Sequence, residues 1–161
     1  MKSHRLFPAF LLFAFAIPIC AQVRPGEVDS LLKGASNALD HWRQLAPGIH
    51  CEEATQQDFR DACKIDLETM KGRVQESNAE IARYRQQSTP QVVDLFDAYE
   101  GFGRVWEVVE GMNRAADSYG EQNRQVLVDA YNTFVKVNGW FGAVMRASIQ
   151  DAAKCSDHGH T

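Results

Sequence analysis

Proline, the residue that most restricts helices, is scarce along most of this chain. Beyond residue 40 it occurs only at Pro47 and Pro90. Proline removes a backbone donor and breaks helices, so long uninterrupted helices are permitted nearly everywhere in this region. Apolar residues recur there at steps of three and four, which predicts amphipathic helices and not strands. The expected fold class is therefore all-α.

The periodic segments predict four helices, at residues 25–46, 55–88, 90–118 and 121–153. Thr55 and Asp58 have the spacing of a capping box at the start of the second helix. Thr89-Pro90 resembles a start signal for the third, with threonine as the cap and proline at the first helical position. Short connections favour antiparallel neighbours, so we expect an antiparallel up-down-up-down four-helix bundle within residues 22–154. The first helix is shorter than the later ones, and we expect it to leave part of the bundle uncovered.

The first 21 residues have the pattern of an N-terminal signal peptide. Lys2 and Arg5 form a basic start, an uncharged apolar run covers Leu6–Ile17, and the small Ala21 offers a cleavage site. The run is shorter than the roughly 20 apolar residues of a membrane-spanning helix. We therefore expect cleavage after residue 21, no stable membrane insertion afterwards, and an exported mature protein that is periplasmic or secreted.

A lipid anchor is the alternative for this segment, because Cys20 could serve as a lipid-attachment cysteine. The bacterial lipoprotein signal has small residues directly before that cysteine. Here Pro18 and Ile19 precede it, so the sequence favours a soluble exported product.

The mature chain is expected to be acidic. All 21 acidic residues follow the signal, whereas two of the 17 basic ones, Lys2 and Arg5, leave with it. The 15 basic residues that remain, against 21 acidic ones, give a net charge of −6. A phosphate backbone requires clustered positive charge, so nucleic acid is not expected as a partner.

Three cysteines follow the signal, and an oxidising compartment predicts at least one disulfide among them. Cys51 lies between the first two helices, and Cys63 lies about two turns into the second. Cys155 falls at the opposite end of the predicted bundle, well beyond the roughly 7 Å limit for bonded Cα atoms. We therefore expect a structural disulfide between Cys51 and Cys63. A redox-active pair is the alternative, but the spacing lacks a Cys-x-x-Cys arrangement.

Residues 155–161 form a polar tail that is expected to be disordered. The leftover Cys155 suggests one alternative function, a structural protein that forms a homodimer through this thiol. With His158 and His160 it also supplies ligands of the kind that zinc and copper use. A metal-carrying protein is therefore a second alternative.

Signatures of enzymes and cofactor proteins do not occur in the sequence. These include Glu-x-x-His pairs, Cys-x-x-Cys-His, Gly-x-Ser-x-Gly and a phosphate-binding glycine loop. Noncovalent haem is a further alternative, through His41 and one of Met70, Met112 or Met145. The leading interpretation includes no cofactor and no catalysis.

Glycines interrupt the third and fourth predicted helices, at Gly101, Gly103, Gly139 and Gly142. Each costs about 1 kcal/mol relative to alanine, which calls for a reason. Gly101 and Gly139 are both 19 residues from Gly120, so an antiparallel hairpin would place them at one level. Either the missing side chains let two backbones approach closely, or they leave a groove lined by aromatic rings.

The second possibility identifies a candidate binding site. Its residues are Phe102, Gly103, Trp106, Gly139, Trp140 and Phe141. Such a groove could take a flat or greasy small molecule or a partner helix. The predicted function is therefore an exported, noncatalytic binding module for a small apolar ligand or a protein partner.

Overall fold

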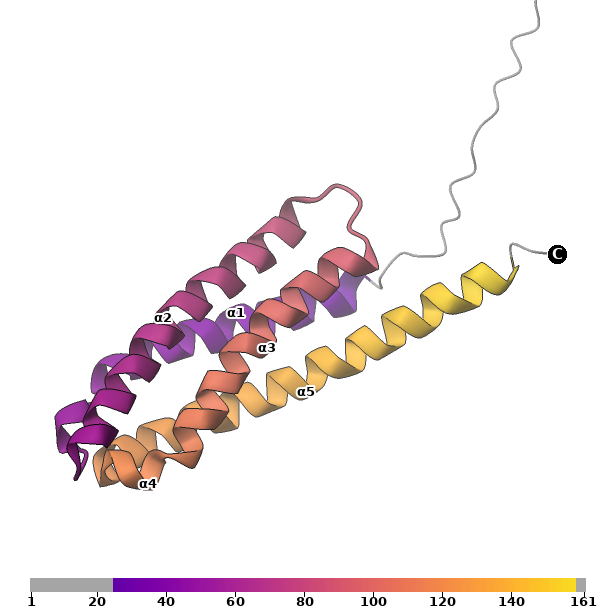
Figure 1. Cartoon of the computed structure of the whole chain (residues 1–161). Helices are drawn as coiled ribbons and strands as arrows, with labels where there is room; N and C mark the ends of the chain where they lie inside the picture. The colour runs from indigo at the N-terminus through magenta and orange to yellow at the C-terminus, as the bar shows by residue number, and fades with distance from the viewer. Residues whose placement is uncertain (1–24, 159–161) are drawn as a thin grey trace, which may run out of the picture.

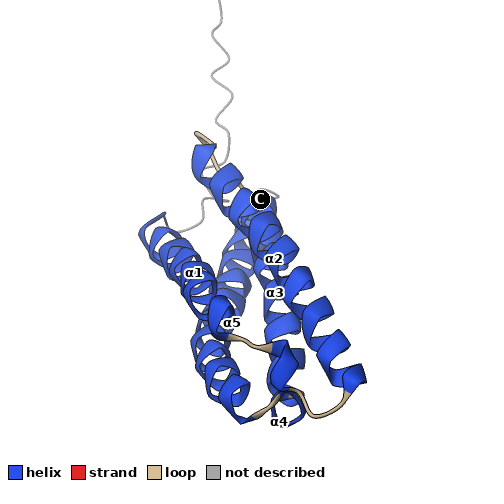
Figure 2. Ribbon diagram, turned by 90° about the vertical axis from the view of Figure 1, so that its left-hand side faces the viewer, coloured by secondary structure: helices blue, strands red, loops and turns tan. Residues whose placement is uncertain are grey.

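The computed structural model describes residues 25–158, with side chains described for residues 26–154. All regular structure in this part of the chain is helical, and no strand occurs within it (Figures 1 and 2). The all-α prediction is therefore confirmed. The segment predicted to be a signal peptide, residues 1–21, lies outside the described residues.

Four long helices carry the fold. They are α1 (Pro25–Leu45), α2 (Gln57–Gln86), α3 (Val92–Arg114) and α5 (Glu121–His158). Three short pieces connect them: the 3-10 turns η2 (Ala46–Gly48) and η3 (Cys51–Glu53), and the single helical turn α4 (Ala116–Tyr119). The helix expected over 90–118 is thus divided at Ala115, which is the C-cap of α3 and the N-cap of α4 and has φ −89° and ψ 0°.

The two predicted helix starts differ from the observed ones. The N-cap of α2 is Gln56, and no side chain caps it, so the Thr55 capping box is wrong. Helix α3 begins at Val92 and not at the predicted Thr89-Pro90 signal, because the cap is Gln91, two residues after the predicted cap. There the Gln91 backbone N–H donates to the Asp94 carboxylate, with 2.7 Å between nitrogen and oxygen. This bond is the main reason that the pKa of Asp94 is lowered.

Helix α5 is longer than predicted and ends at His158. The expectation of a disordered tail is therefore wrong for residues 155–158, whereas residues 159–161 lie outside the described chain. The physical reason is that neither proline nor glycine interrupts the sequence between Gly142 and Gly159. The C-terminal part of α5 projects past the other helices at one end of the molecule (Figure 1).

Aromatic side chains hold α3 and α5 together. The Phe102 ring lies 5.4 Å from that of Phe134 and 5.7 Å from that of Phe141, measured between centroids. Further along, Trp106 packs on Tyr131 at 5.2 Å. Residue numbers rise along α3 as they fall along α5, so the two helices are antiparallel.

Helices α2 and α3 meet at a glycine. A Cβ atom built on Gly101 would lie 3.4 Å from the Cα of Ser77 and 3.4 Å from the Cγ of Glu80. Nearer the connection between the two helices, Arg83 pairs with Asp97 at 2.6 Å. The missing side chain of Gly101 therefore lets the backbone of α2 approach that of α3 closely.

Ser77 at this contact offers a stability prediction. Its side chain is fully buried, and its hydroxyl has no hydrogen-bond partner among the described residues. Ser77→Ala removes the cost of burying that hydroxyl and improves helix propensity, so the free energy of unfolding should rise by about 1 kcal/mol. Urea denaturation measures this change. Ser148→Ala is the control, because the Ser148 hydroxyl donates to Val144 O, and a gain of equal size there would contradict the explanation.

Helix α1 packs antiparallel on α5. Trp140 lies over Gly34, where an added Cβ would be 3.2 Å from the indole Cζ3. About two turns further along α1, His41 Nε2 lies 3.2 Å from the Asp129 carboxylate. The contact with Trp140 thus depends on a glycine in α1.

The loop between α1 and α2 is fastened to the other elements at two places. Cys51 and Cys63 form the predicted disulfide, with their Cα atoms 5.6 Å apart. The buried Asn123 accepts from His50 N–H at 2.7 Å and donates to the His50 carbonyl at 2.9 Å. Beside the loop, α4 is bonded to α2, because the Tyr119 hydroxyl donates to the Asp66 carboxylate at 2.7 Å. Burial raises the pKa of this tyrosine, and the bond to Asp66 adds a smaller effect in the same direction. These contacts fix the end of the molecule opposite the projecting end of α5 (Figure 1).

Candidate ligand-binding groove

The six residues predicted to line a groove do not share one surface. Phe102 and Phe141 are fully buried and fill the space between α3 and α5. Trp106 packs on Tyr131, whereas Trp140 lies over α1 and is 37% exposed. For Gly103 and Gly139, an added Cβ would meet nothing within 4 Å. These six residues therefore do not form the expected aromatic groove.

The predicted close approach of Gly101 to Gly139 is also wrong. Gly101 faces Ser77 on α2, and Gly139 is exposed on α5. Equal distance from the turn places two residues at the same height along a hairpin. It does not determine how each helix is rotated about its own axis. Close packing through glycine is real in this fold, but it involves a different pair of helices.

Three hollows open along the seam between α1 and α2, and we call them together the α1–α2 groove. Their volumes are about 450, 490 and 200 Å³. The first lies between the C-terminal part of α1 and the first half of α2, and the others follow toward the start of α1. The apolar lining residues used below are Leu32, Trp42, Leu67, Val74, Ile81 and Tyr84.

The first hollow has an apolar floor. Trp42 and Val74 lie at its base, each only 3% exposed, and half-buried Leu67 and Ala46 form its sides. Its volume lies within the usual 300 to 1,000 Å³ of ligand pockets. The hollow can therefore accept an apolar group, provided that the rest of the ligand tolerates an open, polar rim.

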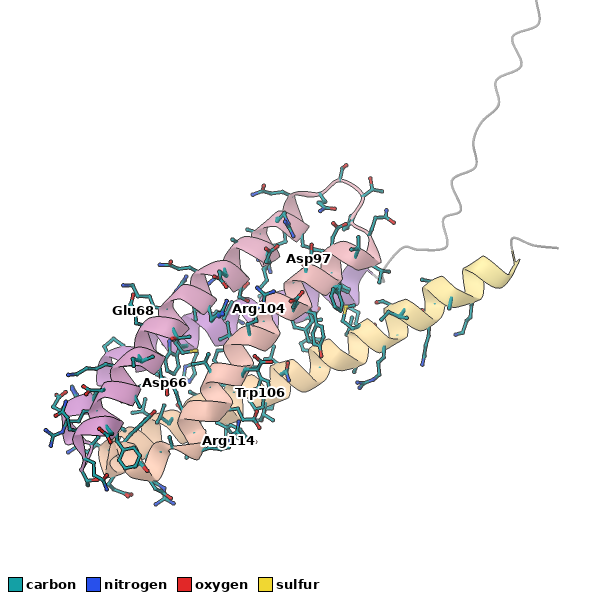
Figure 3. All side chains as sticks on the ribbon, in the orientation of Figure 1. Asp66, Glu68, Asp97, Arg104, Trp106 and Arg114 are labelled. Atoms are coloured by element: carbon teal, nitrogen blue, oxygen red, sulfur yellow. A yellow bond between two sulfur atoms is a disulfide. The ribbon has the colours of Figure 1, made fainter. Side chains whose placement is uncertain are left out.

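Charged side chains form that rim. Lys64, Lys71 and Glu68 from α2 and Arg43 from α1 line the first hollow. Lys71 pairs with Glu68 at 3.4 Å, and Figure 3 shows Glu68 on the outer side of α2. These side chains place charged groups around an apolar floor. A ligand site usually combines apolar and polar groups in this way.

The third hollow, at the far end of the groove, is the smallest of the three and is partly polar. Val28 and Leu32 from α1 face Tyr84 and Arg85 from α2 across the third hollow. Burial, with a smaller effect from the charge of Asp94, raises the pKa of Tyr84. A tyrosine is neutral at physiological pH even without this shift, so the phenol offers an uncharged wall.

The sequence predicted that the first helix is shorter than the later ones, and α1 has 21 residues against 30 in α2. This difference in length does not account for the groove, which lies alongside α1 and not beyond its end. The residues of the site were not identified, because Trp42, Leu67 and Val74 continue the apolar stripes that predict core packing. No periodicity rule separates a stripe that meets another helix from one that lines a groove.

The sequence also offered candidate ligands for a metal ion or for haem. Among the described residues, no three His, Cys, Asp or Glu side chains are grouped in a way that could hold a metal ion. His41 contacts Asp129, and the three candidate methionines are buried. The side chains of Cys155 and His158, together with the whole of His160, lie outside the described part.

Comparison with known proteins gives no relative: no family model, curated protein or solved structure matches this chain. Within residues 25–158, none of the helices has the length and apolar character needed to cross a membrane.

Proposed function

We propose that this chain is an exported, noncatalytic binding module, that its helices form an up-down-up-down four-helix bundle, and that the α1–α2 groove is its binding site. The observation that carries the proposal is the first hollow, where Trp42 and Val74 lie beneath a 450 Å³ opening at the surface. An apolar floor surrounded by a few polar groups is the usual composition of a ligand site. The groove binds its ligand by burying apolar surface, and the rim charges orient it.

Trp42 provides a direct test of the site. Replacing Trp106 and Trp140 by phenylalanine leaves Trp42 as the single tryptophan of the chain. The probe is 1-anilinonaphthalene-8-sulfonate, an apolar anion whose emission rises in apolar surroundings. We expect saturable binding with energy transfer from Trp42, measured by fluorescence titration. Circular dichroism of the same samples shows whether the variant keeps its helices.

A matched pair of charge insertions locates the binding. Leu67→Asp places a charge inside the groove, whereas Ile65→Asp places it on the same helix at a position that is 66% exposed. Burying a carboxylate is costly, so Leu67→Asp should weaken dye binding by about tenfold or more, and Ile65→Asp should leave it nearly unchanged. Equal effects in two folded variants would place the dye elsewhere and count against the proposal.

A further inference from the structure

We propose that the occupant of the α1–α2 groove is an acidic amphipathic helix of a partner protein, which deepens the proposed function and depends on it. In this mode of recognition, a helix places apolar side chains in the hollows of a groove. The charge of the groove, its length and the distribution of its cations along it support this assignment.

The sign of the charge in the groove is opposite to that of the whole chain. Four basic side chains line the three hollows: Arg43, Lys64, Lys71 and Arg85. Two acidic ones, Asp29 and Glu68, do so as well, which leaves a local charge of +2. The chain as a whole carries −4. Complementary charge selects partners and speeds their association, so this groove favours an acidic ligand.

Two of the four cations are free to meet such a ligand. Lys71 pairs with Glu68, and Arg43 pairs with Asp40 at 2.9 Å. Lys64 and Arg85, in contrast, form no ion pair with any side chain that the structure describes. An acidic partner would therefore gain new ion pairs at these two positions without breaking existing ones.

The distribution of cations distinguishes a helix from a small amphiphile. Lys64 lines the first hollow and Arg85 the last two, and 21 residues of α2 separate them, which corresponds to about 32 Å. A single-chain amphiphile carries one anionic head and would meet the cations at one end only. A helix of about 20 residues spans the same distance and can present carboxylates along its whole length.

The chain's own N-terminal segment is a poor occupant on the same grounds. Residues 1–24 include Lys2, Arg5 and Arg24 and no acidic residue. Like charges would meet at Lys64 and Arg85, which opposes docking. The charge therefore favours a different chain as the occupant.

Three synthetic peptides test the assignment. They share one helical pattern of leucines at i, i+3, i+4 and i+7 and carry glutamate, lysine or glutamine beside the leucine stripe. The reporter is the Trp42 emission of the chain with Trp106 and Trp140 replaced by phenylalanine. We expect the glutamate peptide to bind at least about tenfold more tightly than the lysine peptide, with the difference decreasing as salt is added.

Charge reversal in the groove should invert this preference. The test variant combines Lys64→Glu and Arg85→Glu. The control variant combines Lys33→Glu and Lys136→Glu, which changes the net charge equally at exposed positions outside the groove. The first double variant should bind the lysine peptide best, and the second should behave like the parent. Neither pair contributes to the buried core, so both variants should keep the helical circular dichroism of the parent.

Other outcomes would overturn the inference. Equal affinity for the three peptides, or an unchanged preference after charge reversal, would show that the rim does not select acidic helices. Dodecanoate that displaces the glutamate peptide, and whose binding depends on Lys64 alone, would identify a small amphiphile as the occupant. Self-association in sedimentation that is lost in the groove variants would identify a second copy. Dye binding without peptide binding would reject the helix and retain the groove, whereas the loss of both would reject the proposed function too.

Discussion

Phe102→Ala should lower the free energy of unfolding by about 4 kcal/mol. The Phe102 side chain is fully buried between α3 and α5, where its ring contacts Phe134 and Phe141. Truncation removes both ring contacts and leaves a cavity that the packed helices can fill only in part. Urea denaturation followed by far-ultraviolet circular dichroism measures the change.

Phe96→Ala is the control for this prediction. Phe96 lies in the same helix but is 46% exposed, so its removal should cost less than about 1 kcal/mol. If the two variants lose similar stability, the packing of α3 against α5 through Phe102 is not as described. A loss below about 1.5 kcal/mol for Phe102→Ala would lead to the same conclusion.

The second large effect is expected at the disulfide. Cys51 and Cys63 are separated by 12 residues, and a crosslink that closes such a loop stabilises a fold by about 3 kcal/mol in the chain-entropy description. The double replacement Cys51→Ala with Cys63→Ala should therefore lower the free energy of unfolding by about that amount. The helices should persist, because Asn123 still bonds the loop at His50.

Dithiothreitol provides the matched control for this variant. Reduction should bring the parent chain to nearly the stability of the double variant and leave the variant itself unchanged. A double variant as stable as the oxidised parent would show that the hydrogen bonds of Asn123 are sufficient to order the loop. A further loss on adding reductant to the variant would point to a different thiol.

Features that depend on nearby residues were predictable from the sequence. The apolar spacing predicted the helical fold class, and the buried positions of α1, such as Val28, Leu31 and Trp42, follow that spacing. The disulfide was predictable because Cys51 and Cys63 are close in the chain, whereas the predicted order of the helices places Cys155 at the other end. The first conclusion requires only local spacing, and the second adds the helix order.

Features that depend on how two distant surfaces fit were not predictable in this way. The partner of Gly101 is Ser77 on α2, and only the rotation of α3 about its axis determines this. Asn123 forms a hydrogen bond with His50, 73 residues earlier in the chain, and no sequence motif predicts this pair. The α1–α2 groove also depends on how two helices fit together, because Trp42 lies beneath an opening whose walls come from both of them.

The most direct test of the account maps the glutamate peptide onto the folded chain by its effect on backbone amide chemical shifts. We expect the perturbed amides to cluster along α1, the adjoining turn η2 and α2, at Trp42, Ala46, Leu67, Lys71 and Ile81. Helices α3 and α5 offer a clear contrast, because they expose Phe96, Val135 and Ile149, which do not line the groove. Perturbations that gather at those residues, or that spread without a cluster, would contradict the assignment of the α1–α2 groove as the binding site.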